Sequence, residues 1–255
     1  MLKKTMFFLI CGICLTLAAS PKYYRRHIQV AKVSGMTPEN ALEHPIWKKT
    51  PEYQMMHIVR AAEDINRLPD EGGIVQCLYD DQYFYCRVQF FDSDIINSGT
   101  KDGQHFYRTG DLLEIFIKPA KASYYWECYG TPNKLKTRFF YASRATLHFA
   151  SNFVHKDTGL KVDAKVDGTM NDSSDTDKSY TVLLAMPISD LNLPLLSPEK
   201  HPAGAVPFAP GNIWLLQAAR YNYGKTLNNF ELSCFPQSVG GFHSIEHFIE
   251  IELLK

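Results

Sequence analysis

The sequence predicts an all-β protein folded as an antiparallel β-sandwich, and three observations support this. Residues 74–79 and 83–91 are apolar and aromatic segments on either side of a short polar turn. Residues 161–166 alternate strictly between apolar and charged side chains, the pattern of a strand with one buried face. Residues 112–117 are almost wholly apolar. No helical segment of about 10 to 15 residues separates these runs, so an antiparallel sandwich is favoured over a parallel sheet.

The elements follow in order along 255 residues. Residues 20–45 are expected to lie draped over the domain, and Trp47 to close one edge of the sandwich. Asp81 and Gln82 are expected at the centre of the first hairpin turn. Residues 167–178 are rich in Gly, Asn, Asp and Ser, and 194–210 hold five prolines, so both predict loops. The predicted strands are 74–79, 83–91, 112–117, 124–129, 161–166, 180–186, 214–220, 231–235 and 248–253.

Glu114 is the most informative residue of strand 112–117. Strand side chains alternate between faces, so Leu113, Ile115 and Ile117 share one face while Glu114 lies with its apolar neighbours on the other. A carboxylate in such surroundings needs hydrogen-bond partners or a ligand, because burying it unpaired costs several kcal/mol. Glu114 is therefore either a binding-site residue or the partner of a buried arginine, for which Arg108, Arg144 and Arg220 are candidates.

Several motifs, in a fixed order and spacing, resemble the family 9 carbohydrate-binding modules and their single-domain relatives. The resemblance covers roughly residues 40–255 and implies a β-sandwich of the jelly-roll type, also described as DOMON-like. It implies a non-catalytic protein with a carbohydrate ligand. The segments that carry the resemblance are 79–85, 91–95, 109–116, 124–127, 180–188, 211–220 and 242–248.

The resemblance also implies a binding site. In these modules the Glu of the Asp-x-x-Glu-x-Phe strand hydrogen-bonds sugar hydroxyls, and that Glu corresponds to Glu114. Two aromatic residues clamp the sugar; the first corresponds to Arg108, with Tyr107 the nearest aromatic, and the second to Phe242. Gln217 corresponds to a polar position near the penultimate strand. The modules carry Trp at both clamp positions, so this chain departs from the pattern.

Two further candidates come from the residues themselves. A sugar ring offers apolar faces and a rim of hydroxyls, so it is held by flat aromatic surface together with planar polar groups. Trp126 and Arg220 supply such groups, although a large aromatic is most often a core residue. The predicted ligand-binding set is Tyr107, Arg108, Glu114, Trp126, Gln217, Arg220 and Phe242.

Three other functions remain open at this stage. Asp111, Glu114 and Glu127 could supply the two carboxylates of a glycosidase, but no pair is fixed at a catalytic distance. A haem- or redox-type DOMON-like sandwich would need axial Met or His ligands, such as Met186. A module with altered clamp residues could also be a surface or assembly component that has lost sugar binding.

The N-terminus predicts export. Lys3 and Lys4 precede an apolar run that ends in small residues, the pattern of a signal peptide cleaved after Ala19. Residues 20–255 would then form one secreted or extracytoplasmic domain, in the periplasm or at the cell surface, without a membrane span. Cleavage reduces the 27 basic residues to 25 against 27 acidic ones. This near-neutral balance argues against nucleic acid as a partner.

Cysteine and metal chemistry are open from the sequence. Four cysteines remain after cleavage, and Cys77 lies opposite Cys86 if the hairpin turns at residues 81–82, so a bridge between them is geometrically allowed. No cofactor is expected. Calcium is an alternative through the oxygen-rich loop, but its spacing matches no EF-hand. The loop residues in question are Asp167, Asn171, Asp172, Asp175 and Asp177.

Overall fold

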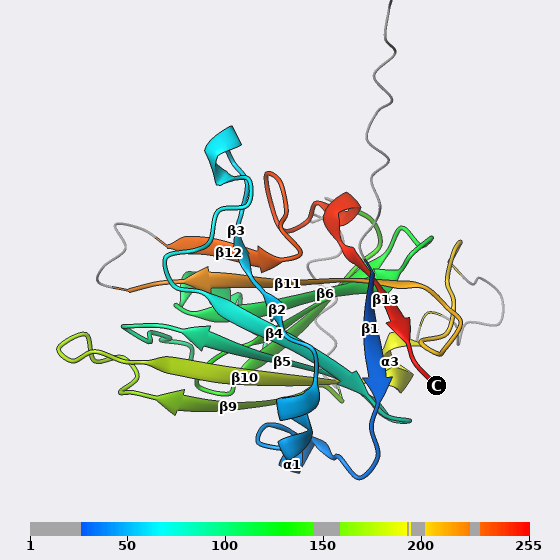
Figure 1. The fold of residues 1–255 in the computed structure, drawn as a ribbon, viewed down its shortest axis with the longest axis horizontal. Coiled ribbons are helices and arrows are strands. Elements are labelled where there is room, and N and C mark those ends of the chain that lie inside the picture. Colours follow the sequence, from blue (N-terminus) through cyan, green and yellow to red (C-terminus); the bar gives the residue numbers. More distant parts are fainter. Residues whose placement is uncertain (1–26, 145–158, 193, 195–201, 225–229) are drawn as a thin grey trace, which may run out of the picture.

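The computed structural model describes residues 27–144, 159–192, 194, 202–224 and 230–255. The regular secondary structure of this part of the chain is mostly β-strand, which confirms the predicted all-β class. Figure 1 shows two layers of strands that curve toward each other and almost close into a barrel. The predicted signal peptide, residues 1–19, lies outside the described residues.

The first layer, which we call sheet I, carries the candidate site. Five of its strands lie side by side, and each pairs with its neighbours in antiparallel orientation. Its order is β8-β7-β6-β11-β13, and β12 pairs with the second half of β11 and with β3. The strands are β3 (Met56–His57), β6 (Leu112–Pro119), β7 (Tyr125–Gly130), β8 (Lys136–Tyr141), β11 (Trp214–Asn222), β12 (Glu231–Phe235) and β13 (Ile249–Leu253).

The second layer, sheet II, is built around the predicted hairpin. Its order is β4-β5-β10-β9, with the short β2 (Tyr53–Gln54) on the outer edge of β4. The Asp80 N–H donates to the Tyr83 carbonyl at 3.0 Å, so Asp81 and Gln82 form the turn centre as predicted. The strands are β4 (Gly73–Tyr79), β5 (Tyr83–Phe91), β9 (Lys161–Asp167) and β10 (Ser179–Pro187).

Strand β1 (His27–Lys32) joins the two sheets. Its first four residues pair in parallel with β13, and Ala31 and Lys32 pair in parallel with β4. The expectation of a draped segment is therefore wrong for residues 27–32. Alternation over so few residues is weak in sequence, and the segment gains its hydrogen bonds from strands about 50 and more than 220 positions away. Strand β8 was likewise not predicted.

Helices are short and lie between strands. Within the described residues no helix is long and apolar enough to cross a membrane. Trp47 is buried in a small cluster with Leu78 and Tyr85 against sheet II, as expected of a residue that closes an edge. The helices are α1 (Pro38–Ala41) and α3 (Ile188–Leu191), and the 3-10 turns are η1 (Pro45–Lys49), η2 (Ala62–Asp64), η3 (Phe106–Arg108) and η5 (Ile245–His247).

The main core fills the space between the two sheets. All residues predicted to face inward contribute to it, with the β9 residues Val162 and Val166 only partly buried at its edge. These residues are Leu113, Ile115, Ile117, Val162, Ala164 and Val166. A second cluster, mostly aromatic, covers the opposite side of sheet I, which we call its outer face.

Candidate functional site

Strand β6 places Glu114 on the outer face of sheet I. Leu113 and Ile115 pack in the core between the sheets, whereas Leu112 and Phe116 belong to the aromatic cluster on the other side. Glu114 lies between the latter two and is only 3% exposed. The predicted alternation is thus confirmed, and the carboxyl group is buried in largely apolar surroundings.

The strand register brings two more polar side chains to the same place. Phe116 is paired with Gln217 of β11 on one side and with Glu127 of β7 on the other. Because directly paired residues project to the same face of a sheet, Gln217 and Glu127 flank Phe116 and lie diagonal to Glu114. We call Glu114, Glu127 and Gln217 the acceptor group.

The two carboxyl groups lie close enough to influence each other's ionisation. Burial raises the pKa of Glu114 well above its usual value, and the charge of Glu127 raises it further. Burial also raises the pKa of Glu127 to about 7, against hydrogen bonds from Tyr141 and Tyr129 that lower it. Near neutral pH the pair therefore holds protons and can both donate and accept hydrogen bonds.

Two oxygen atoms of the acceptor group are left without a hydrogen bond. Glu127 Oε2 and Gln217 Oε1 are buried and have no partner in the described part of the chain. The Gln217 Nε2 group is used, since it donates to the Phe242 carbonyl at 2.8 Å. A buried acceptor without a donor costs free energy, so its presence calls for an explanation such as a ligand that donates to it.

Aromatic rings lie beside the acceptor group. Tyr221, on the same face of β11 as Gln217, has its ring centroid 5.9 Å from that of Tyr107 and 5.6 Å from that of Phe242. Tyr221 therefore lies between the two residues predicted to clamp a ligand. The pKa of Tyr221 is raised above 10 mainly by burial and next by the charge of Glu114, which shows how near this ring is to the acceptor group.

His243 and Tyr125 occupy another side of the group. The Tyr125 hydroxyl and His243 Nδ1 are 2.8 Å apart, and the imidazole packs edge-on against Phe116 with centroids 5.2 Å apart. Burial, and then the charge of Arg144, lowers the pKa of His243 to about 4. The imidazole is neutral at pH 7 and brings no positive charge to the carboxyl groups.

Arg108 and Tyr107 differ in their exposure to solvent. Arg108 is exposed, with its guanidinium 5.2 Å from the centroid of the Tyr107 ring. Tyr107 is partly buried and packs against the aromatic cluster of the outer face. Of the two residues at the first clamp position, Tyr107 is the one whose ring packs against Tyr221 on the outer face.

Trp126 and Arg220 are not brought together with Glu114. Both project from the inner face of sheet I: Trp126 packs in the core between the sheets, and the fully buried Arg220 reaches the core residues Phe90 and Tyr180 of sheet II. Arg220 Nη2 donates to Asp92 Oδ2 at 2.7 Å. The sheet itself thus separates these two predicted site residues from the rest.

The predicted alternative of a Glu114–arginine pair is also wrong for the described residues. Arg220 is paired with Asp92, and Arg144 Nη1 donates to Glu246 at 2.7 Å. Arg108 lies in solvent beside Tyr107. No Lys or Arg of the described ranges comes within ion-pair distance of Glu114 or Glu127.

Three residues of this face were missed as ligand candidates: Glu127, Tyr129 and Tyr221. The sequence shows that Glu127 and Tyr129 share a face of their strand, but only the register of β6 against β7 shows that this face is the one with Glu114. Tyr221 could have been found from the alternation of side chains along a strand alone. It lies four residues after Gln217, so the two share a face of β11.

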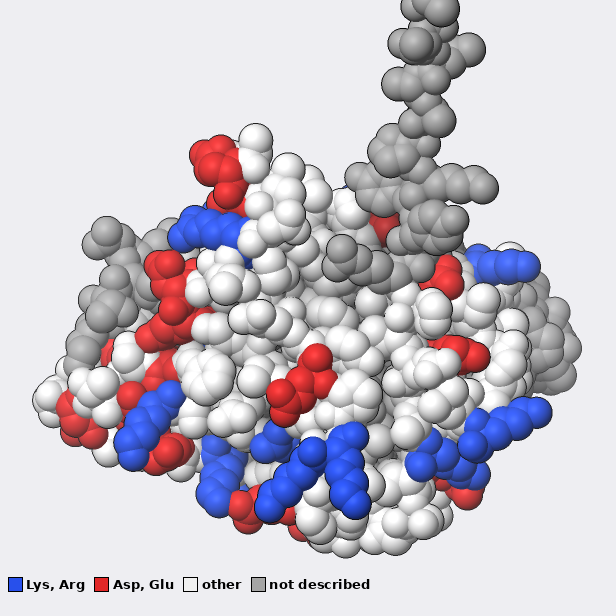
Figure 2. Space-filling model, in the orientation of Figure 1, with Lys and Arg blue, Asp and Glu red and all other residues white. Residues whose placement is uncertain are grey.

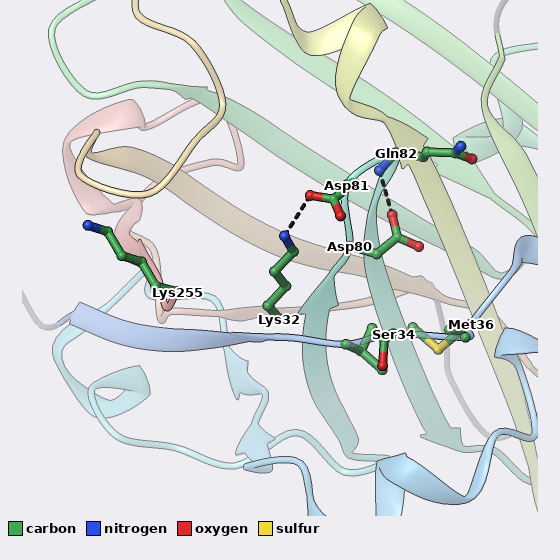
Figure 3. A pocket seen from close by; sticks show the side chains of 9 residues that line it. Lys32, Ser34, Met36, Asp80, Asp81, Gln82 and Lys255 are labelled. Atoms are coloured by element: carbon green, nitrogen blue, oxygen red, sulfur yellow. Dashed lines mark hydrogen bonds and ion pairs between the residues drawn. The ribbon is translucent and has the colours of Figure 1, made fainter.

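Other surface features are weaker candidates. Figure 3 shows an open hollow of about 630 Å³ at the tip of the β4–β5 hairpin. Its charged groups at the hairpin turn already have partners: Lys32 Nζ pairs with Asp81 at 2.6 Å, and Asp80 Oδ1 accepts the N–H groups of Gln82 and Tyr83. On the face drawn in Figure 2, acidic and basic residues are interspersed with uncharged surface.

The metal and haem alternatives gain no support from geometry. Within the described ranges no three His, Cys, Asp or Glu residues come together as a metal site. In the oxygen-rich loop, the Asp177 carboxylate accepts the backbone N–H groups of Ile95 and Thr169 and so fixes the loop. Met186, the candidate axial ligand, is packed in the main core.

The chain is thus a curved β-sandwich with a buried carboxyl group and aromatic rings on the outer face of one sheet. Residues 41–201 match the family described as carbohydrate family 9 binding domain-like, so the chain belongs to this family. No curated protein matches the chain.

Three solved structures share the fold. The first is described as a putative carbohydrate-binding protein from Bacteroides uniformis, with 12% identity, a TM-score of 0.58, and coverage of 90% of this chain and 99% of that one. The others are a family 9 carbohydrate-binding module from Caldicellulosiruptor kristjanssonii in complex with glucose and with cellotriose. The glucose complex has 14% identity, a TM-score of 0.55, and coverage of 90% of this chain and 96% of that one. The cellotriose complex has 15% identity, a TM-score of 0.54, and coverage of 89% of this chain and 93% of that one.

Proposed function

We propose that this protein is a secreted, non-catalytic carbohydrate-binding protein that holds a sugar or glycan end on the outer face of sheet I. The observation that carries the proposal is the acceptor group, in which Glu127 Oε2 and Gln217 Oε1 are buried without partners beside Glu114. A sugar presents several hydroxyl donors at once, and these would satisfy such acceptors. Family membership and the two Caldicellulosiruptor structures in complex with sugars support the same assignment.

Each part of the site has a role in this proposal. Glu114 accepts sugar hydroxyls, and Gln217 fixes the ring orientation with its free oxygen. Tyr107 and Phe242 offer aromatic surface to the apolar face of the sugar. Tyr221 lies between these two rings, so the sugar would rest against Tyr221 and not be enclosed between two facing tryptophans.

The carboxyl groups do not form a catalytic pair in this proposal. A glycosidase needs one carboxyl group as acid and a second at a defined distance as nucleophile or base. Asp111 cannot fill either role, because its buried carboxylate accepts the N–H groups of Ile96 and Tyr223. Incubation with a polysaccharide panel should release no new reducing ends, and their appearance would overturn this assignment.

The binding experiment is calorimetric titration of the mature chain with glucose, cellotriose and a glycan panel. Glu114→Gln keeps the shape of the side chain but replaces one carboxyl oxygen, which can accept a sugar hydroxyl, by an amide NH2 group, which cannot, so it should cost about 1 to 3 kcal/mol of binding free energy with little change in folding. Glu252→Gln is the matched control, since Glu252 is exposed on β13 and should leave binding unchanged. Equal affinities of both variants would contradict the proposed site.

Export is the second part of the proposal. The Lys3-Lys4 start and the apolar run up to Ala19 support a cleaved signal peptide. Sequencing of the exported protein should therefore begin at Ser20. An intact Met1 on a protein retained inside the cell would contradict this part and leave the binding assignment standing.

A further inference from the structure

Cys77 and Cys86 lie side by side in the core of sheet II. They are directly paired across the β4–β5 hairpin, and their sulfur atoms are 3.8 Å apart. Cys77 is 3% exposed and Cys86 is fully buried. Both are free thiols in this structure, as are Cys128 on β7 and Cys234 on β12.

The hydrogen-bond pattern of the hairpin shows what kind of pair this is. The Asp80 N–H donates to the Tyr83 carbonyl, and the Phe91 N–H donates to the Gly72 carbonyl. Hydrogen-bonded pairs in an antiparallel ladder alternate with non-hydrogen-bonded pairs, so the even-numbered residues of β4 are the hydrogen-bonded ones. Cys77 and Cys86 therefore form a non-hydrogen-bonded pair.

Non-hydrogen-bonded pairs bring the side chains closest together. Their Cα atoms are about 4.5 Å apart, which lies within the range of about 4.4 to 6.8 Å that a disulfide spans. A small rotation of the two side chains, without movement of the backbone, brings the sulfurs to bonding distance. Cys128 and Cys234 lack this geometry, because they belong to clusters on opposite faces of sheet I.

We propose that Cys77 and Cys86 are a disulfide site, oxidised as the chain folds in an oxidising compartment outside the cytoplasm. The proposal uses the exported state from the proposed function but not the sugar site. One thiolate attacks a disulfide oxidant, and the second cysteine thiolate displaces the oxidant from the mixed disulfide. The S–S bond forms as two thiols lose two protons and two electrons, and the oxidant's disulfide is reduced to two thiols.

The disulfide has to form before folding is complete. In the folded protein the pair is out of reach of an oxidant, and the hydrogen bond with Cys77, and next burial, keep the pKa of the Cys86 thiol well above its usual value. The hairpin is local, with eight residues between the cysteines, so it can form before the two sheets pack. The bridge would close at that stage and would then be shielded from reductants by the core.

The decisive experiment does not depend on export. The chain Ser20–Lys255 is unfolded and reduced, refolded in a glutathione redox buffer, and then unfolded in acid and alkylated. Two cysteines, Cys128 and Cys234, should be labelled, and peptide mapping should find Cys77 linked to Cys86. Four labelled cysteines, or a bridge between another pair, would overturn the proposal.

Two variants sharpen this result. Cys77→Ala should give three labelled cysteines, whereas the matched control Cys128→Ala should keep the bridge and give one. Wild type refolded in reductant, which prevents the bridge, should melt roughly 5 to 10 °C below wild type refolded in the redox buffer, and the two preparations of Cys77→Ala should melt alike. Four free thiols in protein exported by its own N-terminus would show that the bridge does not form in the cell.

Discussion

Both faces of sheet I bury ionisable side chains, with an ion pair on the inner face and two neighbouring carboxyl groups on the outer face. On the inner face, Arg220 is matched to Asp92 and also donates to the carbonyls of Glu71 and Phe91 and to Asn222. On the outer face, Glu114 and Glu127 lie together, with no cation of the described residues in ion-pair contact.

This difference separates a structural network from a candidate binding site. Arg220 has an ion-pair partner and three further acceptors for its two Nη groups, with its Nε left unpaired among the described residues, so this buried charge mainly ties the two sheets together. Buried carboxyl groups whose pKa values are raised by burial, and in Glu114 also by the charge of its neighbour, and that leave acceptor atoms unused, favour a functional site. The comparison therefore makes predictions of opposite kind for the two faces.

The largest expected effect comes from the inner face. Arg220→Met removes one partner of a fully buried pair and leaves the Asp92 carboxylate without its cation, which should cost about 3 to 5 kcal/mol of unfolding free energy in urea. Arg144→Met is the matched control, because the Arg144–Glu246 pair is about half exposed and should contribute at most about 1 kcal/mol. Equal losses for both variants would remove the distinction between buried and exposed pairs.

The next effect is a pH dependence from the outer face. The folded-state pKa of Glu127 is about 7, above the ordinary 4.5, so its contribution to stability is fully present below pH 4.5 and is lost as pH rises through 7. The wild type should lose about 3 kcal/mol of unfolding free energy between pH 5 and pH 9 from this group. Glu127→Gln cannot ionise and should show a flatter profile.

Urea unfolding at pH 5, 7 and 9 measures this difference. Glu252→Gln serves again as the control and should keep the slope of the wild type, since Glu252 is exposed on β13. A slope that Glu127→Gln does not change would assign the pH dependence to other buried carboxyl groups. Such a result would contradict the raised pKa of Glu127.

The sequence predicts which face of a strand each residue occupies, but it does not predict the register or pairing between distant strands. The alternation of residues 112–117 gave the correct face of Glu114, and the polar turn gave the hairpin of β4 and β5. Parity could also have placed Arg220, since it shares a face of β11 with the core residue Trp214. The expectation that Arg220 binds ligand gave more weight to its neighbours than to this parity.

What the sequence could not give is register and long-range pairing. The meeting of Glu127 with Glu114 depends on how β7 slides against β6, and a shift of one residue would have turned Glu127 to the core. The Arg220–Asp92 pair joins residues 128 positions apart. Strand β1 is a strand because its residues pair with β13 and β4, and the sequence of the segment alone does not show these pairings.

The smallest expected effect decides which residue serves the first clamp position. Tyr107 packs beside Tyr221 on the outer face, whereas its neighbour Arg108 is exposed. Loss of one stacking ring costs roughly 1 kcal/mol, so Tyr107→Ala should weaken glycan binding several-fold and Arg108→Ala should leave it unchanged. Titration of both variants with the same glycan measures this. A loss confined to Arg108→Ala would instead show that the guanidinium contacts the sugar from the exposed side, and the ligand would then lie over the rim of the acceptor group and not over Tyr221.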